Sequence, residues 1–207
     1  MNLILSESEL RVFGVLVEKE LATPDYYPMS LNAMVNACNQ KTNRDPVTNY
    51  DDDTVQHALD SLREKGIGTR ILGDRVPKYG HRAYETLNLG RRELALLAVL
   101  MLRGPQTSAE LKERAQRMHD FDDLDGVELC LKRLAEGGFA VLLARQPGQR
   151  EARWAHLLAG EPIIPLHTPM HAEVRETAVS REDRIAKLEQ EFAALRAEFD
   201  DFKKRFE

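Results

Sequence analysis

The chain has little of what secreted and membrane proteins usually need. Its 207 residues include only two cysteines, Cys38 and Cys130, which stand far apart and form no CxxC pair. A disulfide framework is therefore not predicted. No run of about 18 apolar residues appears, which argues against a membrane-spanning helix, and the first residues lack the basic and apolar regions of a secretory signal. These absences predict a cytoplasmic protein with free thiols and no membrane contact.

Motifs of catalytic and metal sites are also missing. The sequence contains neither a GxxxxGK[ST] phosphate loop nor a GxSxG nucleophile turn. Cys38 is expected near a helix C-terminus, where the helix dipole disfavours a thiolate. The run from Asp120 to Gly126 lacks the ligand positions of a calcium loop, and His167 and His171 have no evident third metal ligand. We predict a protein that is not an enzyme, with no cofactor and no metal.

The first part of the chain predicts three helices followed by a hairpin. Ser6 to Glu9 is a capping box that opens the first helix. Ser30 can cap a short second helix, and Asp51 or a neighbour caps a third helix that ends at Gly66. Two β-capable runs joined by a segment rich in Gly and Pro then predict a hairpin, with strands at 67–72 and 82–87.

The same order of elements then repeats. An apolar helix is predicted at 91–102, a second capping box at Thr107 to Glu110 opens the next helix, and a third runs from about Asp122 to Glu136. A second hairpin is predicted from the runs 139–143 and 152–157. Helix, helix, helix and hairpin, twice over with a period of about 80 residues, is the winged-helix layout.

The predicted fold is therefore mainly α with small β-hairpin wings, an α+β arrangement. Its parts are a first winged-helix domain at 1–89, a second at 90–160, a linker at 161–180, and a C-terminal amphipathic, coiled-coil-like helix at 181–207.

The predicted C-terminal helix carries an a/d seam with alternating steps of three and four residues, formed by Ile185, Leu188, Phe192, Leu195, Phe199, Phe202 and Phe206. A helix of about three heptads is only marginally stable in isolation, so this apolar seam must pack against another surface. A homodimer is the first choice, and folding back onto the same chain is the alternative.

Two stretches carry a resemblance to a known family. Residues 18–46, EKELATPDYYPMSLNAMVNACNQKTNRDP, closely resemble the YceH-like family of uncharacterised bacterial proteins, and residues 103–111, RGPQTSAEL, look like the same family. The resemblance covers most of the chain and implies tandem winged-helix domains. It implies no established activity, so no catalytic residue is carried over.

The distribution of charge argues against docking of the third helix in a DNA groove. The formal net charge of the chain is -5. Residues 1–88 hold 10 Lys/Arg and 13 Asp/Glu, and residues 89–160 hold 11 and 10, so neither predicted domain is strongly basic. The outward face of the first domain's third helix is expected to present Asp53, His57, Asp60 and Glu64. Carboxylates on that face would repel phosphates. In the second domain the matching face, Asp125, Leu129, Lys132 and Glu136, is mixed.

Two hypotheses about the binding partner remain compatible with this distribution of charge. The first hypothesis is a regulator-like protein that binds duplex DNA weakly through backbone contacts from the turn between helices two and three and from the first wing. Its contact residues would be Asn39, Gln40, Lys41, Asn43, Arg44, Arg70, Arg75, Lys78, His81 and Arg82. The second hypothesis is a protein–protein interaction module that uses the acidic faces of the third helices and the Tyr-Pro segment. In the Tyr-Pro segment, Tyr26 and Tyr27 either cap the core or form a groove for a partner.

Overall fold

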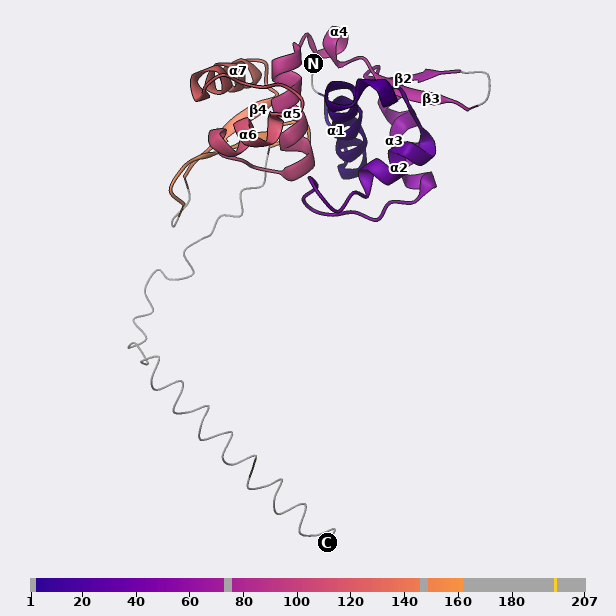
Figure 1. Ribbon diagram of the computed structural model, residues 1–207, viewed down its shortest axis with the longest axis horizontal. Helices are drawn as coiled ribbons and strands as arrows, with labels where there is room; N and C mark the ends of the chain where they lie inside the picture. Colours follow the sequence, from indigo (N-terminus) through magenta and orange to yellow (C-terminus); the bar gives the residue numbers. More distant parts are fainter. Residues whose placement is uncertain (1–2, 73–75, 146–148, 162–195, 197–207) are drawn as a thin grey trace. The chain divides into compact units, whose positions relative to one another are not determined.

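The computed structural model describes residues 3–72, 76–145 and 149–161, together with Arg196. The chain divides into two units, Met1–Ile163 and Ile164–Glu207, and Arg196 is the one described residue of the second. The first unit is mainly helical with small antiparallel sheets (Figure 1). The predicted linker beyond Glu161 and the predicted C-terminal helix lie outside the described residues, apart from Arg196. The same holds for all seven predicted seam residues, Ile185, Leu188, Phe192, Leu195, Phe199, Phe202 and Phe206.

Three helices and a three-stranded sheet make up the first half of this unit. The helices are α1 (Glu7–Ala22), α2 (Leu31–Cys38) and α3 (Asp52–Glu64), with a short 3-10 helix at Pro24–Tyr26. The strands are β1 (Met29–Ser30), β2 (Gly68–Ile71) and β3 (Lys78–His81), in the order β1-β3-β2 and all antiparallel. A short helix, α4 (Ala83–Leu87), follows the hairpin.

The second half has the same order with one strand fewer. Its helices are α5 (Arg91–Arg103), α6 (Ser108–Ala115) and α7 (Leu124–Glu136), and its hairpin pairs β4 (Ala140–Leu143) with β5 (Arg153–His156). Gln106, just before α6, forms an isolated antiparallel bridge with Trp154. In the first half Met29, just before α2, pairs with Tyr79 in the same way. The predicted repeat is therefore confirmed at the level of individual strand pairs.

The predicted helix ends are confirmed by their caps. Ser6 and Glu9 form a reciprocal capping box, and Thr107 and Glu110 form the second one. Asp51 accepts from the Thr54 amide at the start of α3. Gly66 and Gly138, which follow α3 and α7, have φ of +77° and +75°, a conformation that favours glycine because a Cβ crowds the backbone there.

The predicted strand at 82–87 is wrong. Residues 83–87 form α4, and the strand lies earlier, at Lys78–His81, inside the segment predicted to be a loop. Ala83 and Leu87 are both buried and four residues apart, which is helical spacing. Asn88, with φ of 52°, then ends the helix. The run Ala-Tyr-Glu-Thr-Leu is short enough for either pattern, and tertiary packing decided between them.

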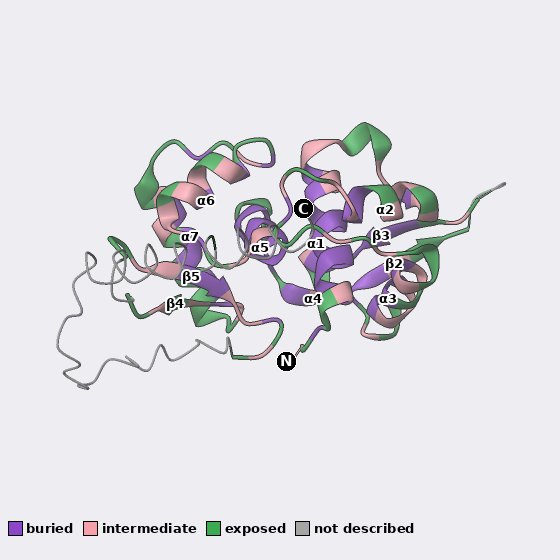
Figure 2. Ribbon diagram, turned by 90° about the horizontal axis from the view of Figure 1, so that it is seen from below, coloured by how far each residue is buried: buried purple, intermediate pink, exposed green. Residues whose placement is uncertain are grey.

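The two halves share one core. Every residue of α5 from Glu93 to Leu102 is buried, and α5 packs along α1 at the centre of the unit (Figure 2). Backbone hydrogen bonds also join the halves, from Leu5 N–H to the Leu158 carbonyl at 2.7 Å and from Asp45 N–H to the Leu102 carbonyl at 2.9 Å. The predicted boundary between residues 89 and 90 falls inside this unit and stays a prediction.

Among the helices that the structure describes, none combines the length and the apolar character needed to cross a membrane.

Candidate functional site

The segment between α2 and α3 is built around a buried arginine. The side chain of Arg44 has no exposed surface, and its Nη2 lies 2.7 Å from Oε2 of Glu18 while Nη1 lies 3.3 Å from Oε1. The same guanidinium donates to the carbonyl oxygens of Ala37 and Asn43 and to Gln40 Oε1. Arg44 was predicted at the contact surface, and the structure places it in the interior, because all its donors are used within the fold.

Two predicted amide contacts also serve the segment itself. Asn39 donates from Nδ2 to the Tyr50 carbonyl at 2.8 Å and accepts from the Tyr50 amide at 2.8 Å, as a paired strand residue would. Gln40 Oε1 accepts from Lys19 at 3.4 Å as well as from Arg44. Lys41, in contrast, is exposed. Most of the polar side chains in this segment therefore tie it to α1 and to the start of α3.

Asn43 links this segment to the second half of the unit. Its backbone is left-handed, with φ of 60°, and its Oδ1 accepts from Arg103 Nη1 at 3.0 Å. Beside it, Arg11 Nη2 donates to the Pro46 carbonyl at 2.5 Å. The segment is thus a joint between α1 and the C-terminal end of α5.

The predicted residues of the first hairpin divide into exposed and buried ones. Arg70, Lys78 and Arg82 are exposed, and Arg75 lies outside the described residues. His81 is buried, with Nε2 2.6 Å from Oε2 of Glu20 and Nδ1 accepting from the Ala83 amide at 3.1 Å. His81 was predicted as a contact residue, and the structure places it inside because Gly80 and His81 continue β3 into the core.

The two tyrosines of the Tyr-Pro segment have different environments. Tyr26 is 80% exposed. Tyr27 is half-buried, and its Oη accepts from the His81 amide at 2.6 Å, so it ties this segment to the hairpin. Burial raises the pKa of the Tyr27 hydroxyl, which keeps it neutral. The structure therefore gives Tyr27 the core-capping position and leaves Tyr26 at the surface.

The buried thiols offer no reactive group. Cys38 is fully buried, and burial raises its pKa to about 12. Burial also raises the pKa of Cys130. Both side chains are thus protonated at neutral pH and pack as small apolar groups.

The outward faces of the third helices match the charge pattern expected from the sequence. On α3, Asp53, His57 and Glu64 are exposed, and the partly exposed Asp60 accepts from Gln56 at 2.8 Å. On α7, Asp125, Leu129, Lys132 and Glu136 are exposed, and Leu129 is 62% exposed. The α3 face is acidic and the α7 face is mixed, as the helical spacing predicts.

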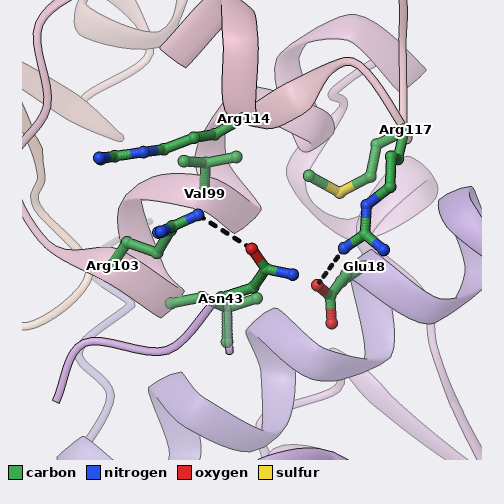
Figure 3. Close-up of a pocket in the computed structure, with 8 residues that line it drawn as sticks. Glu18, Asn43, Val99, Arg103, Arg114 and Arg117 are labelled. Carbon is green, nitrogen blue, oxygen red and sulfur yellow. Dashed lines mark hydrogen bonds and ion pairs between the residues drawn. The ribbon is translucent and has the colours of Figure 1, made fainter. Parts of the chain in front are cut away.

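A pocket with three arginines lies where the two halves meet. Figure 3 shows Arg103, Arg114 and Arg117 around it, with Asn43 and Glu18 among them. Arg103 ends α5, Arg114 belongs to α6, and Arg117 follows that helix. The remaining lining is apolar and consists of Val99, Leu102 and Met118. We call these eight residues the arginine pocket.

Two carboxylates near the arginine pocket, those of Glu18 and Glu110, are held by arginines that do not line it. Glu18 is held by Arg44, and Arg117 approaches it only to 3.9 Å. Burial would raise the pKa of Glu18, but the hydrogen bond and the charge of Arg44 lower it. Arg114 lies 3.8 Å from Glu110, whose carboxylate also binds Arg153 at 2.9 Å.

No signal in the sequence predicts the arginine pocket. Arg103 and Asn43 are 60 residues apart in the chain, and only the packing of α5 on α1 brings them together. Arg114 and Arg117 are three residues apart, but such pairs are common on solvent-facing helices.

The described residues define a mainly helical protein whose unit repeats three helices and a β-hairpin. The chain belongs to the family described as "Protein of unknown function, DUF480", which matches residues 5–149. It is 55% identical over 208 residues to a UPF0502 protein of Solibacter usitatus, with all of both chains covered. A UPF0502 protein of Pelobacter propionicus is 48% identical over 219 residues, again with full coverage. One from Geotalea daltonii is 49% identical over 195 residues, which cover 92% of this chain and 89% of the relative.

Proposed function

We propose that the protein is a non-enzymatic tandem winged-helix protein that binds the phosphate backbone of duplex DNA through its first hairpin. The topology supports the winged-helix assignment. A short strand before the second helix pairs with the second strand of the hairpin in the first half, and the Gln106 bridge repeats this pairing in the second. The resemblance to YceH-like proteins points to the same fold. Fold analogy alone does not establish DNA binding, so the proposal rests on the hairpin.

The observation that carries the proposal is the placement of two free cations on the hairpin. Arg70 is the register partner of Tyr79, and Lys78 is the partner of Ile71. Directly paired residues point to the same face of a sheet, so Arg70 and Lys78 project from opposite faces. Both are exposed, and neither has an ion-pair partner among the described residues. A hairpin with positive charge on both faces suits a groove bounded by phosphates on both sides.

Two further exposed cations extend this surface. Arg82 follows β3 at the base of the hairpin, and Lys41 lies in the segment before α3. Phosphate contacts from such side chains set position and orientation but read little sequence. The acidic outward face of α3 disfavours insertion of that helix between phosphates. The proposed binding is therefore weak, sensitive to salt and largely independent of DNA sequence.

A titration of the full chain against random-sequence duplex DNA at two salt concentrations tests the proposal. Because binding releases condensed counterions, affinity should fall steeply between about 50 and 200 mM salt. Absence of measurable binding at about 50 mM salt would overturn the proposal.

A second candidate function, a protein–protein interaction module, is favoured by one observation. The same hairpin exposes three apolar side chains, Ile71, Leu72 and Val76, and Leu72 is 79% exposed. Tyr26 and the acidic face of α3 would complete that surface. A pull-down with the intact protein, compared with Leu72→Ser and with Lys132→Ala as a control bait, tests it. A partner retained by Lys132→Ala and lost from Leu72→Ser would favour this candidate, and equal retention by all three baits would reject it.

The proposal includes a homodimer formed through residues 181–207, as the heptad pattern predicts. Removing these residues and measuring the mass in solution tests this part. A mass that falls from dimer to monomer supports it, and an unchanged oligomeric state rejects it.

A further inference from the structure

The second hairpin, β4–β5, carries an excess of positive charge, as the first hairpin does. Residues 139–157 hold three Lys/Arg and one Asp/Glu, and residues 68–82 hold four and one. Arg145 and Arg150 are exposed, and neither forms an ion pair with a residue that the structure describes, whereas Arg153 is held by Glu110 at 2.9 Å. Both hairpins of the repeat therefore present exposed cations.

The body between the two hairpins has the opposite charge. The other residues up to residue 160 hold 14 Lys/Arg and 21 Asp/Glu. Part of this excess of acid is exposed on the third helices, at Asp53 and Glu64 of α3 and at Asp125 and Glu136 of α7. A phosphate backbone is therefore attracted to each hairpin and repelled by the surface between them.

The two hairpins lie at opposite ends of the unit. Figures 1 and 2 show β2–β3 at one end and β4–β5 at the other, with α1 and α5 between them. Residues 93–102 of α5 are all buried, and α5 packs along α1. Arg91 donates to the Leu21 carbonyl at 2.9 Å, and Arg103 donates to Asn43 at 3.0 Å. These contacts across the joint hold the two hairpins at a fixed separation.

We propose that one chain bridges two separate DNA duplexes, with the first hairpin on the backbone of one duplex and the second hairpin on the backbone of the other. The inference rests on the proposed function and adds a second duplex as partner. Double-stranded DNA is stiff over about 150 bp, so a short duplex on one hairpin does not curve around an acidic body to reach the other. Two duplexes satisfy both hairpins without being bent.

A capture assay with the full chain and two random-sequence duplexes of about 20 bp, well below the length at which DNA bends easily, tests the proposal. One duplex is immobilised on beads, and the other carries a fluorescent label and is free in solution. The protein retained on the beads reports duplex binding, and the fluorescence retained with it reports bridging. At about 50 mM salt, where phosphate contacts are strong, the wild type should give both signals.

Arg145→Gln/Arg150→Gln should separate the two signals. Both side chains are exposed and unpaired among the described residues, so their replacement should leave the fold intact. The variant should stay on the beads through its first hairpin but capture about tenfold less fluorescent duplex, because two phosphate contacts are lost. The matched control, Arg92→Gln/Lys132→Gln, removes two exposed charges outside both hairpins and should give both signals at the level of the wild type.

The two readouts distinguish failure of this inference from failure of the proposed function. Wild type that stays on the beads without the fluorescent duplex overturns bridging and leaves binding by the first hairpin intact. Wild type that is not retained on the beads overturns both. Full capture by Arg145→Gln/Arg150→Gln would mean that the first hairpins of a homodimer do the bridging, and it would overturn the role of the second hairpin. An equal loss of capture in the control variant would overturn it as well.

Discussion

The guanidinium of Arg44 and the carboxylate of Glu18 meet in a two-pronged pair, at 2.7 and 3.3 Å, where neither side chain is more than 6% exposed. The pair joins the segment after α2 to the middle of α1. Because Glu18 also lines the arginine pocket, the same pair fixes one wall of that pocket. Arg44, which the sequence suggests as a phosphate contact, is thus part of the buried framework.

Arg44→Met should therefore destabilise the folded protein. Removing one partner of a buried ion pair leaves the other charge uncompensated, which costs about 3–5 kcal/mol. We expect that loss in the free energy of unfolding measured with urea. Glu18→Gln/Arg44→Met should lose less than Arg44→Met, since no buried charge is then left without a partner.

Lys41→Ala is the matched control for this experiment. Lys41 lies three residues away in the same segment and is exposed, so its loss should change stability by no more than about 0.5 kcal/mol. Unchanged stability of Arg44→Met would show that the pair contributes nothing to the fold, contrary to this account.

Glu9 should make stability depend on pH in the acid range. Burial would raise its pKa, but hydrogen bonds from Lys65, Ser61 and the Ser6 amide outweigh burial and lower the pKa from 4.5 to about 2. As the pH falls, Glu9 therefore binds a proton in the unfolded chain before it does so in the folded chain. The stabilisation is complete above about pH 4.5 and is lost as pH falls toward 2.

Urea unfolding of the wild type and Glu9→Gln between pH 7 and pH 2.5 measures this effect. Glutamine keeps the capping-box geometry, so the comparison isolates the charge. The difference in the free energy of unfolding between the two proteins should shrink as pH falls below about 4.5. A difference that stays constant over the whole range would contradict the assignment.

Gly80 and Tyr27 should be energetically coupled. A Cβ at Gly80 would lie 2.8 Å from Tyr27 Oη and 3.2 Å from Thr69 Cγ2. Gly80→Ala should therefore cost about 1–3 kcal/mol by overpacking. In a Tyr27→Phe background the closest of these contacts is gone, so the same change should cost about 1 kcal/mol less.

A double-mutant cycle with urea unfolding measures the coupling. Tyr27→Phe alone should cost about 1 kcal/mol, because the His81 amide loses its acceptor. Additive costs across the cycle would mean that the hydroxyl does not limit the space at Gly80.

Local signals in the sequence predict most of the framework. Caps at Ser6, Asp51 and Thr107 are set by neighbouring residues, so they can be recognised without tertiary information. The hairpin register is different, because β3 is fixed by pairing with both β1 and β2 and by the burial of Tyr79. The sequence therefore placed the second strand of the first hairpin four residues too late.

The candidate sites were less predictable than the fold for a physical reason. Residue type shows that Arg44 and His81 are polar, but their burial depends on Glu18 and Glu20 on α1, more than 25 residues away in the chain. The arginine pocket likewise forms only after α5 packs on α1. Exposed side chains such as Arg70 and Lys78 need no distant partner, and their exposure follows from the hairpin alone.

The salt dependence of duplex binding is the sharpest test of phosphate binding by the first hairpin. Each phosphate contact contributes about 0.9 to the slope of log affinity against log salt. Arg70→Gln/Lys78→Gln should therefore lower that slope by about 1.8 relative to the wild type, while Arg92→Gln/Lys132→Gln should leave it unchanged. An unaltered slope in Arg70→Gln/Lys78→Gln, or the same decrease in both variants, would contradict phosphate binding by the hairpin.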